Sequence, residues 1–167
     1  EDESQKAIEM VDTSDMIDDN VLVVYLPDCH ESIAGIIAGR LREKFYKPVL
    51  VITNAEDGAK GSGRSIDGYN MFEEISKCAD LLTKFGGHPM AAGLSLPIEN
   101  IDEFRRRLNI NQRLTDKELT PVVWIDVPMP VSYVTMELVE QLKVLEPFGK
   151  GNEKPIFADK NLVVKSA

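Results

Sequence analysis

Two short apolar runs, residues 21–26 and 49–53, most strongly limit what this chain can fold into. Continuous runs of this length, rich in β-branched residues, are typical of strands buried on both faces of a sheet. Between them, residues 31–46 carry apolar side chains at helical spacing, on Ile33, Ile36, Ile37, Leu41 and Phe45. The order strand, helix, strand predicts a right-handed βαβ unit and therefore an α/β fold.

The rest of the chain continues this alternation of strands and helices. We expect a short acidic helix over 4–18, a glycine-interrupted strand over 60–66, a helix over 71–85, a loop at 86–88, a strand over 91–96 and a charged helix that starts at Pro97. Residues 109–120 are polar and unpatterned, which indicates a boundary. Beyond it we expect a strand over 122–127, a helix over 136–145 and a strand over 156–164, which are too few residues for an independent core.

Composition argues against a membrane protein and leaves nucleic acid open as a ligand. No apolar run approaches the roughly 18–20 residues that a membrane helix needs. The acidic N-terminus is unlike a signal peptide, so we expect a cytoplasmic protein without membrane contact. The formal net charge is −9, but residues 1–31 hold ten acidic residues and one basic residue, while the other 136 residues hold 18 of each. The glycine-rich segments therefore lie outside the acidic part, which permits a phosphate-bearing ligand.

Residues 61–65 form the first candidate binding segment. Gly61 and Gly63 allow the backbone to approach a ligand closely, and the forked guanidinium of Arg64 suits phosphate oxygens. Residues 58–65 nearly match the phosphate-binding pattern G-x-x-x-x-G-K-[ST], but turn residues follow where that loop needs a helix, which argues against it. A glycine-rich hairpin with a surface arginine is the alternative interpretation.

Residues 86–93 form the second candidate segment, in which glycine and alanine residues flank His88 and Met90. Packing requires none of these small residues, so we expect His88 to face a cleft. His30 comes where a strand is followed by a helix, which is where α/β folds place residues that face a ligand. Helix capping is the alternative role for His30.

Two further observations limit the chemistry. The chain has two histidines, His30 and His88, and no cluster of aspartate and histidine, so we expect no metal centre within it. The run Arg105, Arg106 and Arg107 spreads around a helix, which favours a solvated face, with contact to nucleic acid as the alternative.

Three segments in this order, residues 29–41, 61–65 and 84–93, together resemble the DHH-associated domain of the RecJ-like single-strand-specific exonucleases, members of the DHH phosphoesterase family. Residues 145–152 resemble the entry to the OB-fold region that follows that domain. The resemblance covers roughly residues 20–165. The sequence departs from the family pattern at Cys29, usually tryptophan, and at Ser32, usually glycine.

The resemblance implies a DHH-associated domain with a mixed sheet flanked by helices, followed by a partial OB-fold-like α+β segment. The implied division is a connecting helix over 1–19, a substrate-binding domain over 20–112 and the start of a truncated OB-fold region over 113–167. The implied function is the substrate-binding part of a metal-dependent 5′-to-3′ exonuclease. Its partners are single-stranded DNA and a DHH catalytic domain, which holds Mn²⁺ or Mg²⁺ and is missing from this chain.

Mapped onto this sequence, the family pattern implies that Ser62 and Arg64 receive the 5′-terminal phosphate and that His88 orients the reacting phosphate. The expected substrate-binding set is Ser62, Gly63, Arg64, Ser65, Gly86, Gly87, Met90 and His30, with His88 as an auxiliary catalytic residue and no metal ligand. We expect this chain alone to be inactive as a nuclease.

Two alternative functions stay open at this stage. One is a DHH phosphoesterase acting on short oligoribonucleotides or cyclic dinucleotides, against which residues 121–165 weigh, because such proteins usually end earlier. The other is a non-catalytic nucleic-acid-binding module, since related domains accompany alanyl-tRNA synthetases. The sequence upstream of this chain discriminates between them.

Overall fold

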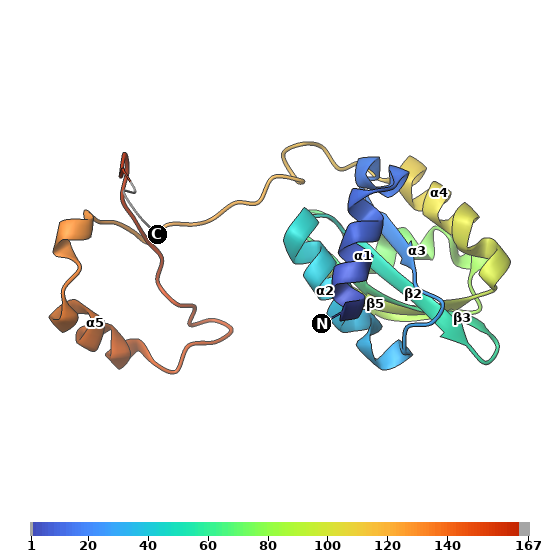
Figure 1. Ribbon diagram of the computed structural model, residues 1–167, viewed down its shortest axis with the longest axis horizontal. Helices are drawn as coiled ribbons and strands as arrows, with labels where there is room; N and C mark the ends of the chain where they lie inside the picture. Colours follow the sequence, from blue (N-terminus) through green and yellow to red (C-terminus); the bar gives the residue numbers. More distant parts are fainter. Residues whose placement is uncertain (1, 164–167) are drawn as a thin grey trace. The chain divides into compact units, whose positions relative to one another are not determined.

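The computed structural model describes residues 2–163 (Figure 1). Its internal contacts divide the chain into two units, with the boundary in the sequence between Pro121 and Val122. The first unit holds a sheet with helices on both faces. The second unit is small and has little regular structure. The three-part division at residues 19/20 and 112/113 stays a prediction.

The first unit is built on a five-stranded mixed sheet with the strand order β1-β2-β3-β5-β4. Strands β1 (Leu22–Tyr25) and β2 (Val49–Ala55) are parallel and are joined through helix α2 (Glu31–Phe45). The predicted βαβ unit is therefore confirmed, with each boundary within two residues. Strands β3 (Gly58–Arg64), β5 (Ala91–Leu96) and β4 (Lys84–His88) extend the sheet in antiparallel order.

Helices cover both faces of the sheet, which explains the continuous apolar runs. Helices α1 (Asp2–Asp12) and α2 pack on one face, and α3 (Met71–Ser76) and α4 (Ile101–Asn111) pack on the other. Successive strand residues alternate between two buried clusters, because a strand presents neighbouring side chains to opposite faces. The cluster under α1 and α2 takes Leu22, Val24, Val49 and Val51, and the cluster under α3 and α4 takes Val23, Leu50 and Ile52.

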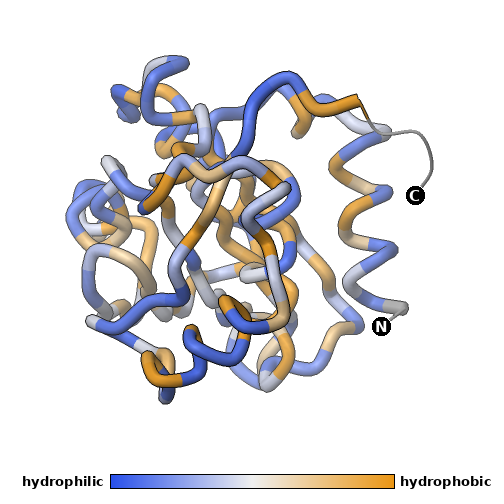
Figure 2. The backbone as a smooth tube through the Cα atoms, turned by 90° about the vertical axis from the view of Figure 1, so that its left-hand side faces the viewer, coloured by the Kyte–Doolittle hydropathy of each residue, from blue (hydrophilic) through white to orange (hydrophobic). Residues whose placement is uncertain are grey.

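Helix α1 is amphipathic, as the alternating hydrophobic and hydrophilic colours beside the N label in Figure 2 show. Its Ala7 and Val11 are fully buried against α2. The expected helix over 4–18 is interrupted, because Ser14 caps a separate 3-10 helix at Asp15–Asp18.

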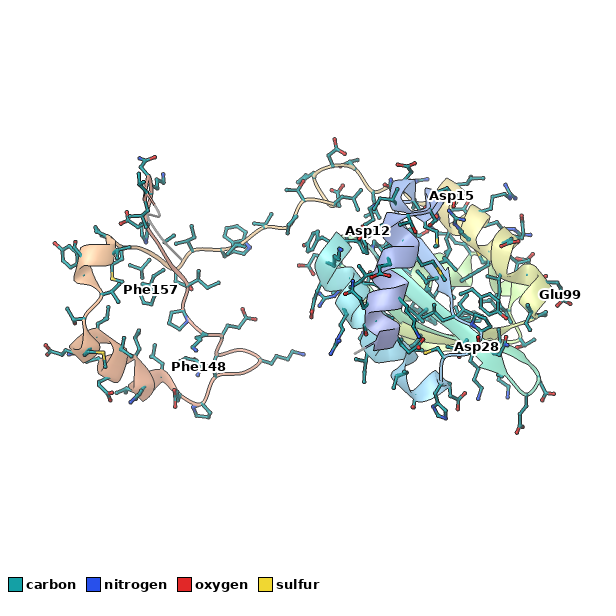
Figure 3. The ribbon with its side chains drawn as sticks, viewed as in Figure 1. Asp12, Asp15, Asp28, Glu99, Phe148 and Phe157 are labelled. Atoms are coloured by element: carbon teal, nitrogen blue, oxygen red, sulfur yellow. The ribbon has the colours of Figure 1, made fainter. Side chains whose placement is uncertain are left out.

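The acidic N-terminal segment is paired with basic residues of later helices. Lys44 of α2 lies 2.8 Å from Asp12, and Arg105 of α4 pairs with Asp15 at 3.3 Å and also with Asp19. Figure 3 labels Asp12 and Asp15. These pairs place much of the negative charge at one end of the first unit, against α2 and α4.

The expected helix over 71–85 begins at the right residue but is too long, and the expected loop at 86–88 was wrong. Helix α3 ends at Ser76, whose hydroxyl donates to the Phe72 carbonyl oxygen, and a 3-10 turn follows at Ala79–Leu81. Residues 84–88 then form the edge strand β4, paired with β5 along its whole length. Residues 84–88 form a strand because they pair with β5, and no local sequence pattern indicates a strand there.

The second unit buries none of its described residues, 122–163. Its strands β6 (Val127–Pro128) and β7 (Phe157–Ala158) form a short parallel pair, and α5 (Met136–Leu142) continues into a 3-10 turn at Lys143–Leu145. Phe148 and Phe157 belong to this unit (Figure 3). The expected helix over 136–145 agrees with the structure, whereas the strands over 122–127 and 156–164 are mostly absent up to residue 163, because little backbone there has a pairing partner. Residue 164 lies outside the described residues.

Gly87 is required for the pairing of β4 with β5. Its φ is +151°, and a Cβ there would lie 2.4 Å from the Ala91 carbonyl oxygen, whereas a Cβ at Gly86 would meet nothing within 4 Å. We expect Gly87→Ala to lower the free energy of unfolding of the first unit by roughly 1–3 kcal/mol. Gly86→Ala is the matched control and should change it by less than about 1 kcal/mol. Urea unfolding measures both, and equal losses in the two variants would contradict the assignment.

Candidate functional site

The register of three strands brings the two candidate segments together. Arg64 of β3 lies opposite Ala91 of β5, and Ala91 lies opposite His88 of β4. Residues directly opposite each other in a sheet point to the same face, so Arg64 and His88 share one face and one row. The two neighbouring rows are Ser62, Gly93 and Gly86, and Lys60, Ser95 and Lys84.

We call these nine positions the open face: Lys60, Ser62 and Arg64 on β3, Ala91, Gly93 and Ser95 on β5, and Lys84, Gly86 and His88 on β4. Helix α2 covers β2 on this side, where it shares a buried cluster with Val49 and Val51, and these two residues lie opposite Arg64 and Ser62 of β3. Gly93 and every residue of β4 are exposed. Polar and basic side chains therefore reach solvent beside the edge of α2.

Arg64 is half-buried and is held by its own strand. Its Nη1 donates to the Gly63 carbonyl oxygen at 2.8 Å and lies 3.5 Å from the Ser62 hydroxyl. Among the described residues, no carboxylate lies within ion-pair distance of Arg64. An arginine without an acidic partner next to a serine hydroxyl is suited to binding an anion.

His88 is exposed at the end of β4, and one of its ring nitrogens is hydrogen-bonded to the backbone. Its Nδ1 accepts a hydrogen bond from the Met90 backbone N–H at 3.3 Å. A neutral imidazole in this arrangement carries its proton on Nε2, which is then able to donate to a ligand oxygen.

The turn between β4 and β5 is tied to the chain that follows Arg64. The backbone N–H of Ser65 donates to the Met90 carbonyl oxygen at 2.9 Å, and that of Met71 donates to the Pro89 carbonyl oxygen at 2.9 Å. These two long-range bonds fix the turn that follows His88 against the segment that follows Arg64. Met90 itself is exposed at the tip of the turn.

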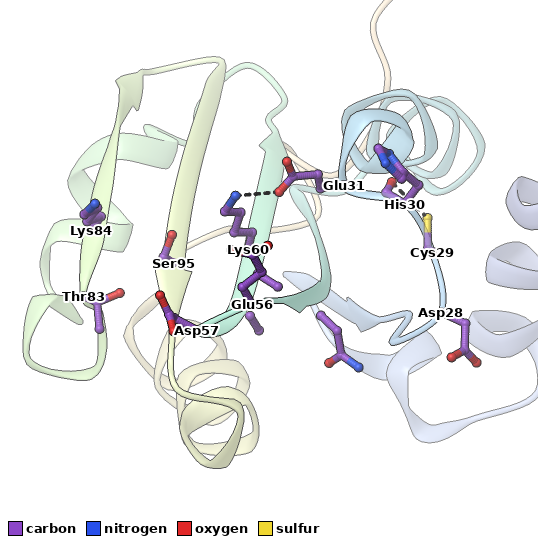
Figure 4. Close-up of a pocket in the computed structure, with 13 residues that line it drawn as sticks. Asp28, Cys29, His30, Glu31, Glu56, Asp57, Lys60, Thr83, Lys84 and Ser95 are labelled. Carbon is purple, nitrogen blue, oxygen red and sulfur yellow. Dashed lines mark hydrogen bonds and ion pairs between the residues drawn. The ribbon is translucent and has the colours of Figure 1, made fainter.

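Two hollows lie beside this row, further along β3. The smaller, of about 430 Å³, is lined by the first turn of α2 and by Thr53, Lys60, Ser62 and Gly93. The larger, of about 860 Å³, contains Lys84, Ser95 and Lys60 on three neighbouring strands, together with several carboxylates (Figure 4). Arg64 and His88 line neither hollow, so their row is open surface rather than the expected cleft.

One ion pair contributes to the lining of both hollows. Lys60 Nζ lies 2.7 Å from Glu31 Oε2, and both residues line both hollows (Figure 4). The hydrogen bond holds the pKa of Glu31 below its ordinary value and raises the pKa of Lys60. Because Lys60 is neutralised by Glu31, the unpaired positive charge near Ser62 comes from Arg64.

Three residues of the expected substrate-binding set have structural roles in the fold, and their part in substrate binding stays a prediction. A Cβ at Gly63 would lie 3.3 Å from the side chains of Leu50 and Met71, so Gly63 faces the core. Ser65 is 1% exposed, and its hydroxyl donates to the Tyr69 carbonyl oxygen at 2.6 Å. Gly87 is needed for strand pairing, as described above.

His30 lies away from the row of Arg64 and His88. Its Nδ1 accepts from the Ser32 backbone N–H at 3.2 Å and lies 2.7 Å from the Ser32 hydroxyl, so it caps α2. It also lines the larger hollow, beside Lys60 at the other end of β3. The capping interpretation is therefore the one that the geometry supports.

The arginine run of α4 is engaged in ion pairs. Arg106 and Arg107 both bind Glu103, Arg107 also binds Asp80, and Arg105 binds the N-terminal aspartates. The two hydrogen bonds from Arg106 and Arg107 lower the pKa of Glu103 to about 2. The run therefore stabilises the helix surface and presents little free charge to a ligand.

The expected site residues did not include five members of the open face: Lys60, Lys84, Ala91, Gly93 and Ser95. A usable signal was present in β3, where Lys60, Ser62 and Arg64 alternate with small residues. Alternation with period two places such residues on one face of a strand. β4 lacks this pattern, because Phe85 is large and Gly86 carries no polar side chain, so no such signal was present there.

The described residues, 2–163, contain no group of three or more histidine, cysteine, aspartate and glutamate side chains that could hold a metal ion. Within the same range, none of the helices is both long and apolar enough to cross a membrane.

Comparison with family models gives two matches. The model described as the DHHA1 domain matches residues 18–111, and the model described as the RecJ OB domain matches residues 125–167.

Individual relatives agree with these models. The single-stranded-DNA-specific exonuclease RecJ of Bacillus subtilis is 39% identical over 97% of this chain, and that of Escherichia coli is 36% identical over 81%. The crystal structure of RecJ from Thermus thermophilus in complex with Mg²⁺ has a TM-score of 0.77 and 26% identity over 92% of this chain, and the same protein has been solved with Mn²⁺. This chain spans only 21–25% of the length of these relatives.

The DHHA1 match covers more than half of the chain and includes both segments that form the open face. The OB match covers nearly all of the second unit. The chain belongs to the DHHA1 domain family, in the form found in RecJ exonucleases, where a RecJ OB segment follows the domain.

Proposed function

We propose that this chain is the substrate-binding part of a single-strand-specific 5′-to-3′ DNA exonuclease, and that its open face holds the 5′-terminal phosphate. The observation that carries the proposal is the shared row of Arg64 and His88, with the Arg64 guanidinium free of any carboxylate among residues 2–163. The RecJ relatives, which are named as single-stranded-DNA-specific exonucleases, supply the substrate class. DNA repair and recombination in the cytoplasm is the setting that suits such an enzyme.

Binding begins with the terminal phosphate. The guanidinium of Arg64 and the hydroxyl of Ser62 lie side by side, so both donate to oxygens of one phosphate. Contacts to phosphate fix the position of a strand without reading its bases, which suits an exonuclease that must act on any sequence.

His88 serves a second phosphate of the same strand. Strands β3 and β4 are both neighbours of β5, so the backbones of Arg64 and His88 lie about 10 Å apart. From that distance the Nε2–H of His88 donates to the next phosphate and orients it for hydrolysis. Only Ala91 lies between Arg64 and His88 in this row, and Gly86 and Gly93 in the neighbouring row have no side chain, which leaves the sugar-phosphate chain close access to the sheet.

The described residues supply no ligand set for a divalent ion. In this proposal Mn²⁺ or Mg²⁺ is held by a DHH catalytic domain outside this chain, and that domain is the partner that faces the open face. The residues of the open face then have binding and orienting roles only.

Removal of the Arg64 guanidinium should abolish the preference for a phosphorylated end. We expect Arg64→Ala, in the complete exonuclease that carries this chain, to lower kcat/KM on 5′-phosphorylated single strands relative to 5′-hydroxyl strands. The loss should correspond to about 1.5–3 kcal/mol of activation free energy. Arg40→Ala, on the exposed side of α2, is the control and should leave the ratio unchanged. Equal ratios in the wild type and Arg64→Ala would count against the assignment.

The 167-residue chain by itself should not hydrolyse DNA. We expect no digestion of labelled single strands with Mn²⁺ present, because the described residues hold no metal cluster. Fluorescence anisotropy with matched 5′-phosphorylated and 5′-hydroxyl oligonucleotides should show tighter binding of the phosphorylated strand. Manganese-dependent digestion by the chain alone would refute the division of roles.

A further inference from the structure

Helix α2 contains two interior glycines, Gly35 and Gly39, one turn apart. Glycine is unfavourable inside a helix relative to alanine, because it has more conformational freedom to lose. Neither residue ends the helix, which runs on to Phe45. The helix itself therefore does not explain why either position is glycine, and the explanation must lie in the neighbouring side chains.

The surroundings of the two glycines differ. A Cβ at Gly35 would lie 2.8 Å from Nη2 of Arg64 and 3.0 Å from the Ser62 hydroxyl oxygen. Real Cβ atoms do not approach other atoms to 2.8 Å, so the guanidinium occupies the space that a side chain at residue 35 would need. A Cβ at Gly39 would meet nothing within 4 Å.

The absence of a side chain at Gly35 leaves the space that the Arg64 guanidinium occupies. On one side, Nη1 is bonded to the Gly63 carbonyl oxygen at 2.8 Å, and on the other, Nη2 lies against the bare backbone of α2. A forked donor binds a phosphate well only in one orientation, so the position of this side chain matters as much as its charge.

We propose that Gly35 is a positioning residue for Arg64, and that its lack of a side chain sets the selectivity of the open face for a terminal phosphate monoester. This inference rests on the proposed function, since it assigns to Gly35 an effect that passes through the Arg64 guanidinium.

The fold does not require glycine at residue 35. The atoms that a Cβ would meet within 4 Å are the end of the Arg64 side chain and the Ser62 hydroxyl, both of which move by side-chain rotation. Alanine there displaces the guanidinium while the helix and sheet stay in place. Folding and phosphate selectivity are therefore separable at this position.

The test compares Gly35→Ala with Gly39→Ala in the complete exonuclease. The measured quantity is the ratio of kcat/KM for 5′-phosphorylated to 5′-hydroxyl single strands. We expect Gly35→Ala to lower this ratio by roughly tenfold or more, mainly by raising KM for the phosphorylated strand. We expect Gly39→Ala to keep the wild-type ratio, and neither variant to lower the unfolding midpoint. A wild-type ratio in Gly35→Ala would overturn the inference.

Two further measurements separate this inference from the proposed function. If Gly35 acts through Arg64, adding Gly35→Ala to Arg64→Ala lowers the ratio no further, and an additional loss would overturn the inference. A crystal structure of Gly35→Ala should show the guanidinium displaced from the Gly63 carbonyl oxygen, and an unmoved guanidinium would overturn it independently of activity. If Arg64→Ala alone keeps the wild-type ratio while that displacement is seen, the proposed function fails and only the steric relation stands.

Discussion

The candidate site depends on the antiparallel register of β3, β5 and β4. Arg64 and His88 come from segments far apart in the chain, and they share a row only because each lies opposite Ala91. A slip of one residue in either pairing would turn one of them toward the core, since strand side chains alternate between faces. Gly87, which no larger residue can replace without striking the Ala91 carbonyl oxygen, therefore supports the site without facing it.

The small residues of the site differ in role according to the face on which they lie. Gly61 and Gly63 face the core, where a Cβ would press on Leu94 and Leu50. Gly86 and Gly93 face solvent, where the first would meet no atom within 4 Å and the second only a backbone oxygen at 3.9 Å. Packing explains the first pair and does not explain the second. Open glycines beside an unpaired arginine are what close contact with a sugar-phosphate chain requires.

The sequence predicted well those features that local pattern controls, and less well those that pairing controls. The apolar runs and helical spacing gave the βαβ unit because both faces of β1 and β2 are buried. β4 looked like a loop, because its two glycines carry no strand signal and β5 alone orders it. Ser65 resembled a ligand residue by adjacency to Arg64, yet the next position along a strand points inward, where its hydroxyl binds the Tyr69 carbonyl oxygen.

The distribution of carboxylates explains how a chain of net charge −9 can present a cationic site. The N-terminal aspartates are drawn to Lys44 and Arg105, Glu103 binds two arginines, and Glu31 binds Lys60. In each of these pairs, a positive and a negative charge neutralise each other at the surface. Arg64 has no carboxylate partner on these strands, because β5 and β4 contribute only alanine, glycine, serine, lysine and histidine to the open face. Salt screens an exposed site strongly, so the hydrogen-bonding geometry of Arg64 and Ser62 must supply much of the selectivity.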